Sequence, residues 1–258
     1  MYKRQAHFGG EWLVYGGLVT LAVAAVSILA AQRLERMAAL SILVSAGTLL
    51  GAVGFAQAAL TGAALFYLVN STLALCALFL LAELVERSRS ANEAPLDDEE
   101  DAMPPPLESL HPPKGINLDD EQQVVIGQII PWTMAFLGLS FIACALLIIG
   151  MPPLSGFVGK LNLISALFNP LGLGVPVEQP LSAAGWGLVA LLILSGMASL
   201  IAFGRVGIQR FWKPEERPSP VLRRYECLPI VILLGLCLIL SFKACLLYTS
   251  DAADDSLR

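Results

Sequence analysis

Charged side chains are scarce in this sequence: lysine, arginine, aspartate and glutamate together supply only 14% of its 258 residues. Hydrophobic residues supply 56%, and the mean hydropathy is +0.71. One water-soluble core cannot hide that much apolar surface. The composition therefore argues against an ordinary soluble domain and predicts a chain that is solvated by lipid.

Residues that bind metals or nucleotides are also sparse. Both histidines, His7 and His111, lie outside the apolar segments, and the five cysteines lack the spacing of zinc or iron–sulfur ligands. No glycine-rich nucleotide loop is present. We therefore expect no cofactor, no metal site and no nucleic-acid partner, and we interpret the cysteines as small buried hydrophobic residues.

Long apolar runs dominate the rest of the chain. A helix of about 20 residues crosses the hydrocarbon core of a bilayer, and six windows come near that length: 12–31, 37–54, 63–84, 129–150, 183–203 and 228–242. A shorter apolar segment covers residues 154–168. The pattern predicts an all-α integral membrane protein with about six transmembrane helices.

Acidic residues and prolines are concentrated in one stretch. Ten of the 21 acidic residues lie between Glu93 and Glu121, and six of the 16 prolines lie there too. Such a segment cannot form a core, so we interpret residues 88–117 as a mostly disordered loop. The chain then divides into an N-terminal tail (1–11), a three-helix membrane segment (12–87), an acidic proline-rich loop (88–127), a second membrane segment (128–244) and a C-terminal tail (245–258).

Basic residues mark one side of the membrane. They are Arg33 and Arg36; Arg87, Arg89 and Lys114; and Arg205, Arg210, Lys213, Arg217, Arg223 and Arg224, whereas connections 58–62 and 169–182 carry none. Because basic residues near span ends stay in the cytoplasm, we expect loops 32–36, 88–127 and 205–227 to be cytoplasmic and both termini to lie outside. The tryptophans fall at predicted span ends, as an interfacial aromatic belt requires.

These basic clusters share one face only if residues 129–168 cross the membrane an odd number of times. A continuous helix of 40 residues would be about 60 Å long, twice the hydrocarbon thickness, so the crossing must be broken. Prolines lack a backbone donor and glycines permit a non-helical path. The residues that supply the break are Gly150, Pro152, Pro153, Ser155 and Gly156. Non-helical backbone at this depth is tolerated only against protein or water, which predicts a cavity.

Lys160 is a charge inside the apolar run 157–164, directly after this break. A lysine near the bilayer centre costs roughly 2.5–3.5 kcal/mol, a cost that usually marks function. Removal from water favours the neutral amine, so Lys160 is a candidate for taking up and releasing a proton. The alternative is that its long stem carries the amine to the membrane surface.

Other polar side chains inside the spans are weaker candidates. Hydroxyls can bond to their own helix, so single ones say little, but three consecutive polar residues in mid-span favour a wet or helix-facing patch. The candidates for a polar lining are Asn70, Ser71, Thr72, Ser41 and Ser45. Glu83 lies one turn before Arg87, a spacing typical of an interfacial ion pair.

Three segments together resemble parts of a known family of membrane proteins. Residues 32–41, 66–72 and 150–160 resemble, in that order, the later half of the proton-translocating antiporter-like membrane subunits. This family includes the large membrane subunits of complex I, related membrane-bound hydrogenase subunits, and the A and D subunits of Mrp/Pha-type Na+/H+ and K+/H+ antiporters. The chain is most similar to the D subunits, since residues 204–212 also resemble their penultimate cytoplasmic loop.

The resemblance covers residues 12–244 and implies a specific fold and function. The six helices would correspond to the ninth to fourteenth of a fourteen-helix fold, with Lys160 as the terminal member of a proton relay. It further implies a bacterial inner membrane, partner subunits in a hetero-oligomer, and protons with Na+ or K+ as the transported ions.

The sequence departs from this family in several places. Asn70 stands where histidine is common, Leu75 lies near the place of a frequent lysine, and the buried lysines of the first half would precede residue 1. Residues 1–5 and 246–256 resemble translated sequencing-adapter read-through. We therefore expect a partial chain that does not transport alone.

Two other functions stay open at this point. One is a proton-pumping subunit of complex I or of a membrane-bound hydrogenase, which the chemistry of the sequence barely separates from an antiporter subunit. The other is a non-transporting membrane scaffold, in which Lys160 is only the partner of an ion pair between helices.

Overall fold

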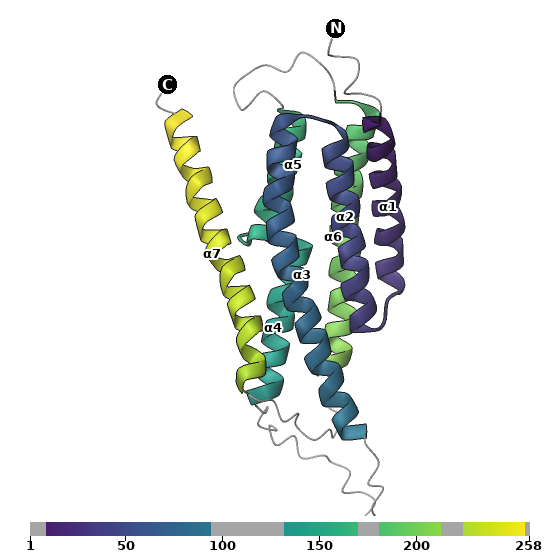
Figure 1. The fold of residues 1–258 in the computed structure, drawn as a ribbon, viewed down its shortest axis with the longest axis vertical. Helices are drawn as coiled ribbons and strands as arrows, with labels where there is room; N and C mark the ends of the chain where they lie inside the picture. Colours follow the sequence, from purple (N-terminus) through teal and green to yellow (C-terminus); the bar gives the residue numbers. More distant parts are fainter. Residues whose placement is uncertain (1–8, 94–131, 170–180, 213–223, 256–258) are drawn as a thin grey trace, which may run out of the picture.

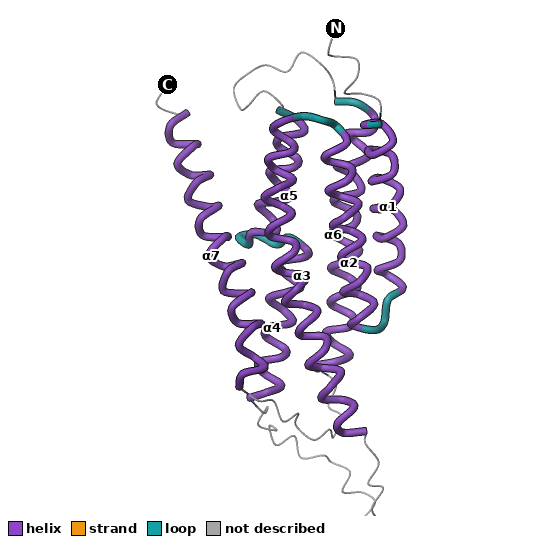
Figure 2. Tube along the Cα trace, viewed as in Figure 1, coloured by secondary structure: helices purple, strands orange, loops and turns teal. Residues whose placement is uncertain are grey.

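The computed structural model describes residues 9–93, 132–169, 181–212 and 224–255. All regular secondary structure in these residues is helical (Figure 2). The elements are α1 (Gly10–Ala30), α2 (Leu34–Gly54), α3 (Ala58–Glu93), α4 (Trp132–Ile149), α5 (Ser155–Phe168), α6 (Ala183–Gly207), a π-helical turn (Ile208–Trp212) and α7 (Arg224–Asp255). Six of the described helices are long and apolar enough to cross a membrane, and α5 is shorter. The predicted fold class is confirmed.

The helices alternate in direction across the bundle, and α4 and α5 together make a single crossing (Figure 1). The α1–α2 connection and the C-terminal ends of α3 and α6 lie at one end, and the α2–α3 connection lies at the other. The basic residues of the first, third and fifth spans are therefore at the same end, as their charge pattern predicts. The single broken crossing formed by α4 and α5 is what makes this parity possible.

Two helices run beyond the predicted segment boundaries. α3 continues past Arg87 to Glu93, and α7 continues to Asp255, inside the predicted C-terminal tail. The residues after Arg87 include no proline or glycine before Pro95, so nothing in them stops a helix. The rest of the predicted acidic loop, residues 94–127, lies outside the described residues.

Backbone contact joins α1 to α2. A Cβ atom placed on Gly17 would lie 2.2 Å from the backbone nitrogen of Gly51, and one on Gly47 would lie 2.7 Å from that of Leu21. Between membrane helices, packing replaces the hydrophobic effect as the source of association, and small residues let backbones approach. The spacing of Gly47 and Gly51 predicts this close helix contact.

We expect Gly17→Ala to destabilise the bundle by about 3 kcal/mol or more, because the new methyl group meets backbone, which cannot adjust as side chains in a core do. Gly16→Ala is the matched control, since a Cβ there would meet nothing within 4 Å. Thermal unfolding of the two variants in detergent measures the difference. Equal melting temperatures would contradict the close approach of α1 and α2.

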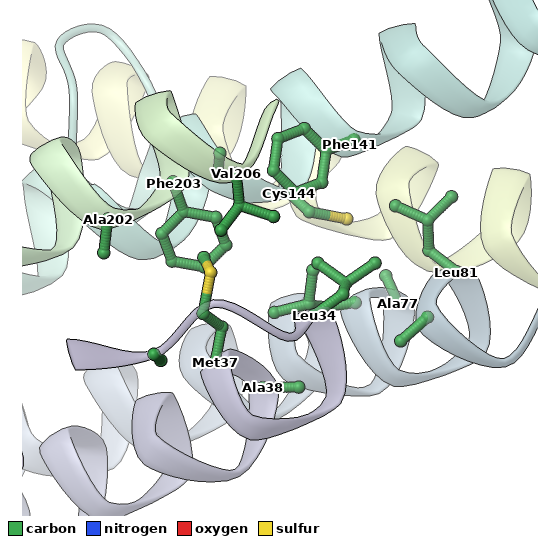
Figure 3. Packing of buried hydrophobic residues seen from close by; sticks show 14 of the residues in the cluster. Leu34, Met37, Ala38, Ala77, Leu81, Phe141, Cys144, Ala202, Phe203 and Val206 are labelled. Carbon is green, nitrogen blue, oxygen red and sulfur yellow. The ribbon is translucent and has the colours of Figure 1, made fainter. Parts of the chain in front are cut away.

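Three apolar clusters lie in the described interior of the bundle, and two of them are large. The first lies towards the α1–α2 connection and includes Met37 of α2, Phe141 of α4 and Phe203 of α6, all at most 3% exposed. Figure 3 shows Met37 directed at the ring of Phe203. The second cluster lies towards the opposite end and includes Leu21 and Leu60. Buried polar residues occur on α2, α3 and α6 near the level where one cluster gives way to the other.

Side chains at the helix ends and on the outside match a lipid environment. Trp12, Trp132 and Trp186 are 84%, 80% and 57% exposed near the starts of α1, α4 and α6, as expected of an aromatic belt.

Cys144 is buried, but Cys76 is exposed, so the prediction of buried cysteines is wrong at that position. A small apolar side chain is stable against lipid as well as in a core.

Candidate functional site: the helix break

The break begins where α4 ends, at Gly150. This residue has φ +82°, in the left-handed region that favours glycine. The backbone nitrogens of Gly150 and Met151 both donate to the Leu146 oxygen, at 3.0 and 3.1 Å. Pro152 and Pro153 follow and lack the donors that would continue a helix. α4 therefore stops here with its last carbonyl groups unused by the helix itself.

Lys160 reaches back from α5 to these carbonyl groups. Its Nζ donates to the oxygen of Ile149 at 2.7 Å and to that of Ile148 at 3.1 Å. A cation suits the negative end of a helix, and hydrogen bonds from a charged donor contribute about 1.5–3 kcal/mol. Two such bonds are enough to offset the roughly 2.5–3.5 kcal/mol cost of a lysine at this depth. The amine is held at the break and does not extend to the membrane surface.

Ser155 and Gly156 begin α5 and pack against the surrounding backbone. Ser155 is completely buried, and its hydroxyl donates to Asn70 Oδ1 of α3. Gly156 touches α4 so closely that a Cβ atom there would lie 1.8 Å from the Leu147 oxygen. The first turn of α5 therefore packs directly on the last turn of α4 and on α3.

A small cavity lies beside the break, between α2, α3, α4 and α6. Its volume is about 10 Å³, close to the room that one water needs. Four of the predicted polar candidates line it: Ser41, Ser45, Asn70 and Ser71. The fifth, Thr72, is exposed and bonds only to carbonyls of α3, so it does not belong to the lining.

Tyr67 and Ser199 complete the polar part of this lining, although no feature of the sequence singles them out. The Tyr67 hydroxyl lies 3.4 Å from Ser45 Oγ, and Ser199 bonds to the Ser195 oxygen. A single hydroxyl on a helix gives no signal of the face on which it lies. Only the packing of α2 against α3 and α6 brings these groups together.

A larger cavity of about 280 Å³ is lined by Lys160. It is mainly apolar and is bounded by the end of α4, by α5 and by α6, with Phe157, Gly196 and Met197 among its walls. Lys160 is half-buried and faces this space. The amine therefore lies between carbonyl oxygens and an open volume into which it can move.

Charged partners of Lys160 are missing from the described ranges. Within them its ammonium contacts backbone oxygens and no carboxylate, and the ion pairs Arg33–Glu35 and Arg87–Glu83 lie away from it. The second of these confirms the predicted interfacial pair, at 2.8 Å. No three His, Cys, Asp or Glu side chains in the described ranges come together as a metal site.

The chain is similar to known membrane subunits. It is 45% identical, over 252 residues, to the D subunit of a probable K(+)/H(+) antiporter of Rhizobium meliloti (strain 1021), a match that covers 97% of this chain and 44% of the relative. It is 29% identical to NADH-quinone oxidoreductase subunit 14 of Thermus thermophilus over 101 residues, which are 38% of this chain and 21% of that subunit. No protein-family model matches the chain.

Solved structures agree at the level of the fold. The Mrp complex of Dietzia sp. DQ12-45-1b superposes with a TM-score of 0.59 at 21% identity, covering 90% of this chain and 21% of the matched chain. Respiratory complex I of Thermus thermophilus with bound aureothin gives a TM-score of 0.53 at 21% identity, covering 90% and 43%. The chain spans less than half the length of the curated relatives that it matches. It is a homologue of the D subunits of Mrp-type antiporters and is related to the membrane subunits of complex I.

Proposed function

We propose that this chain forms part of a multisubunit cation/proton antiporter, in which Lys160 takes up and releases protons at the helix break. The observation that carries the proposal is an amine in mid-span that is bound only by backbone oxygens of the described residues. The amine lies between these oxygens and the 280 Å³ cavity that Lys160 also lines, which gives it two environments. The 45% identity to a K(+)/H(+) antiporter subunit supplies the reaction class and favours K+ as the cation.

The proton changes how strongly the amine is held. A protonated Lys160 carries a full charge to the negative end of α4, where the Ile148 and Ile149 oxygens accept from it. A neutral amine keeps the hydrogen-bonding capacity but loses the charge-assisted part of each bond. It can then leave for the 280 Å³ cavity at lower cost. Proton release and movement of the side chain are thereby coupled.

The proposed location is the bacterial inner membrane, with partner subunits of the antiporter around the bundle. The end that carries Arg33, Arg36 and Arg205 would face the cytoplasm, because basic residues at span ends are retained there. The chain itself would act as a transporter subunit and carry out no redox chemistry.

A proton-pumping role in complex I is the second candidate. It is favoured by the 29% identity to the Thermus thermophilus quinone-reductase subunit, but that match covers 38% of the chain against 97% for the antiporter relative. The scaffold alternative needs an ion-pair partner for Lys160, and no carboxylate of the described residues fills that role. Antiport is therefore the better supported function.

Transport in everted membrane vesicles tests the proposal. Vesicles containing the assembled antiporter, with this sequence in its D subunit, should lose a respiration-generated pH gradient when K+ is added. Vesicles from cells without the complex are the control, and Na+ in place of K+ identifies the cation. If neither cation changes the gradient while the complex is present in the membrane, the antiport proposal is wrong.

A further inference from the structure

Two other helices hold the first turn of α5. The backbone N–H of Ser155 has no acceptor within α5, because the first N–H groups of a helix lack partners inside it. Ser241 of α7 supplies the acceptor: its Oγ lies 2.7 Å from the Ser155 nitrogen. Ser155 is 0% exposed and Ser241 is 7% exposed. Because both residues are buried, water cannot readily reach the Ser155 nitrogen and replace this hydroxyl as its acceptor.

The two hydroxyls form a connected network. Ser241 Oγ donates to the Cys237 oxygen at 2.9 Å, which turns a lone pair towards the Ser155 nitrogen. Ser155 Oγ donates to Asn70 Oδ1, and it lies 3.3 Å from the same Cys237 oxygen. The start of α5 is thus tied to α3 through Asn70 and to α7 through Ser241.

Lys160 follows Ser155 on the same short helix. Five residues of α-helix rise about 7.5 Å, so the two residues move as one rigid unit. The amine of Lys160 is bound to α4, and the N-terminus of α5 is bound to α3 and α7. The break is consequently held at two points, the amine of Lys160 and the N-terminus of α5. Loss of one attachment leaves α5 free to shift and to carry the amine with it.

We propose that Ser241 is a positioning residue for Lys160: its hydroxyl caps the first N–H of α5 and thereby keeps the amine on the carbonyl oxygens of α4. The role rests on the proposed function of Lys160 as the proton-transferring group. It assigns α7, whose described side chains supply no charged group to the break, a direct part in the geometry of proton transfer.

The test compares three variants in the assembled antiporter. Ser241→Ala removes the acceptor and is expected to lower K+/H+ antiport per assembled complex about tenfold, because a buried donor is left without a partner. Ser241→Thr keeps the hydroxyl and should retain most of the activity. Ser195→Ala is the matched control: Ser195 is equally buried, but its hydroxyl bonds only to Leu192 of its own helix.

Cryo-electron microscopy of the Ser241→Ala complex gives a second readout. We expect the Lys160 amine to lie beyond about 3.5 Å from the Ile149 oxygen, outside hydrogen-bond distance. Full antiport in Ser241→Ala, or an amine still bound to Ile149, would overturn the positioning role alone. Antiport that survives removal of the titratable amine at Lys160 would instead overturn the proposed function, and the positioning role with it.

Discussion

Replacing Lys160 with arginine is expected to abolish antiport while leaving the helix break intact. A guanidinium can donate to the same two carbonyl oxygens and suits the negative end of α4. It cannot be deprotonated in a protein, so it cannot pass on a proton. Positioned proton-transfer groups contribute about 10²–10⁴-fold to rates. We therefore expect a fall of at least about a hundredfold, to the background of the vesicle assay.

Lys160→Met separates this effect from a structural one. Methionine also stops proton transfer, but it leaves the Ile148 and Ile149 oxygens without their partner. Unpaired buried groups cost about 1–3 kcal/mol each, so the methionine variant should melt earlier than the arginine variant. If Lys160 only caps α4, arginine should transport nearly as well as lysine and methionine should fail to assemble.

Lys243→Arg is the control for replacing a lysine with an arginine at a position away from the break. Lys243 lies in α7, is exposed, and is not among the residues that bond to the break. Transport per complex in this variant should equal that of the parent protein. The amount of each complex is measured by blotting before rates are compared, so that a loss of assembly is not taken for a loss of transport.

The position of the break could be predicted from the sequence because its cause is local. Two adjacent prolines between two glycines end a helix wherever they occur, and the charge pattern requires an odd number of crossings there. The depth of Lys160 follows from the same residues. Its partners could not be predicted, since they are backbone oxygens and carry no sequence signal.

The polar lining was only partly predictable, for a geometric reason. Successive residues of an α-helix point about 100° apart, so three consecutive polar residues cannot all face one cavity. Asn70 and Ser71 turn inwards, and Thr72 faces outwards. Ser241 could not be predicted either, because its role depends on how α7 packs against α3 and α5. Such contacts arise between segments far apart in the chain.

Among substitutions that add a single methyl group, Gly156→Ala is expected to disrupt the break most. The added Cβ would lie 1.8 Å from the Leu147 oxygen, whereas the nearest atom to a Cβ at Gly159 is a ring carbon of Tyr67 at 3.3 Å. Overpacking in cores costs about 1–3 kcal/mol when side chains can adjust. Here the obstacle is backbone, so we expect a cost at or above the upper end of that range.

The clash should also remove function, because α5 can relieve it only by moving away from α4. Lys160 would then leave the Ile149 oxygen, to which its amine now lies at 2.7 Å. Thermal unfolding and vesicle transport measure the two consequences together. Gly235→Ala on α7 is the control, since a Cβ there meets nothing within 4 Å and alanine favours the helix by up to about 1 kcal/mol. An active, stable Gly156→Ala protein would show that the backbones of α4 and α5 do not touch, and the geometry that places Lys160 on the end of α4 would have to be abandoned.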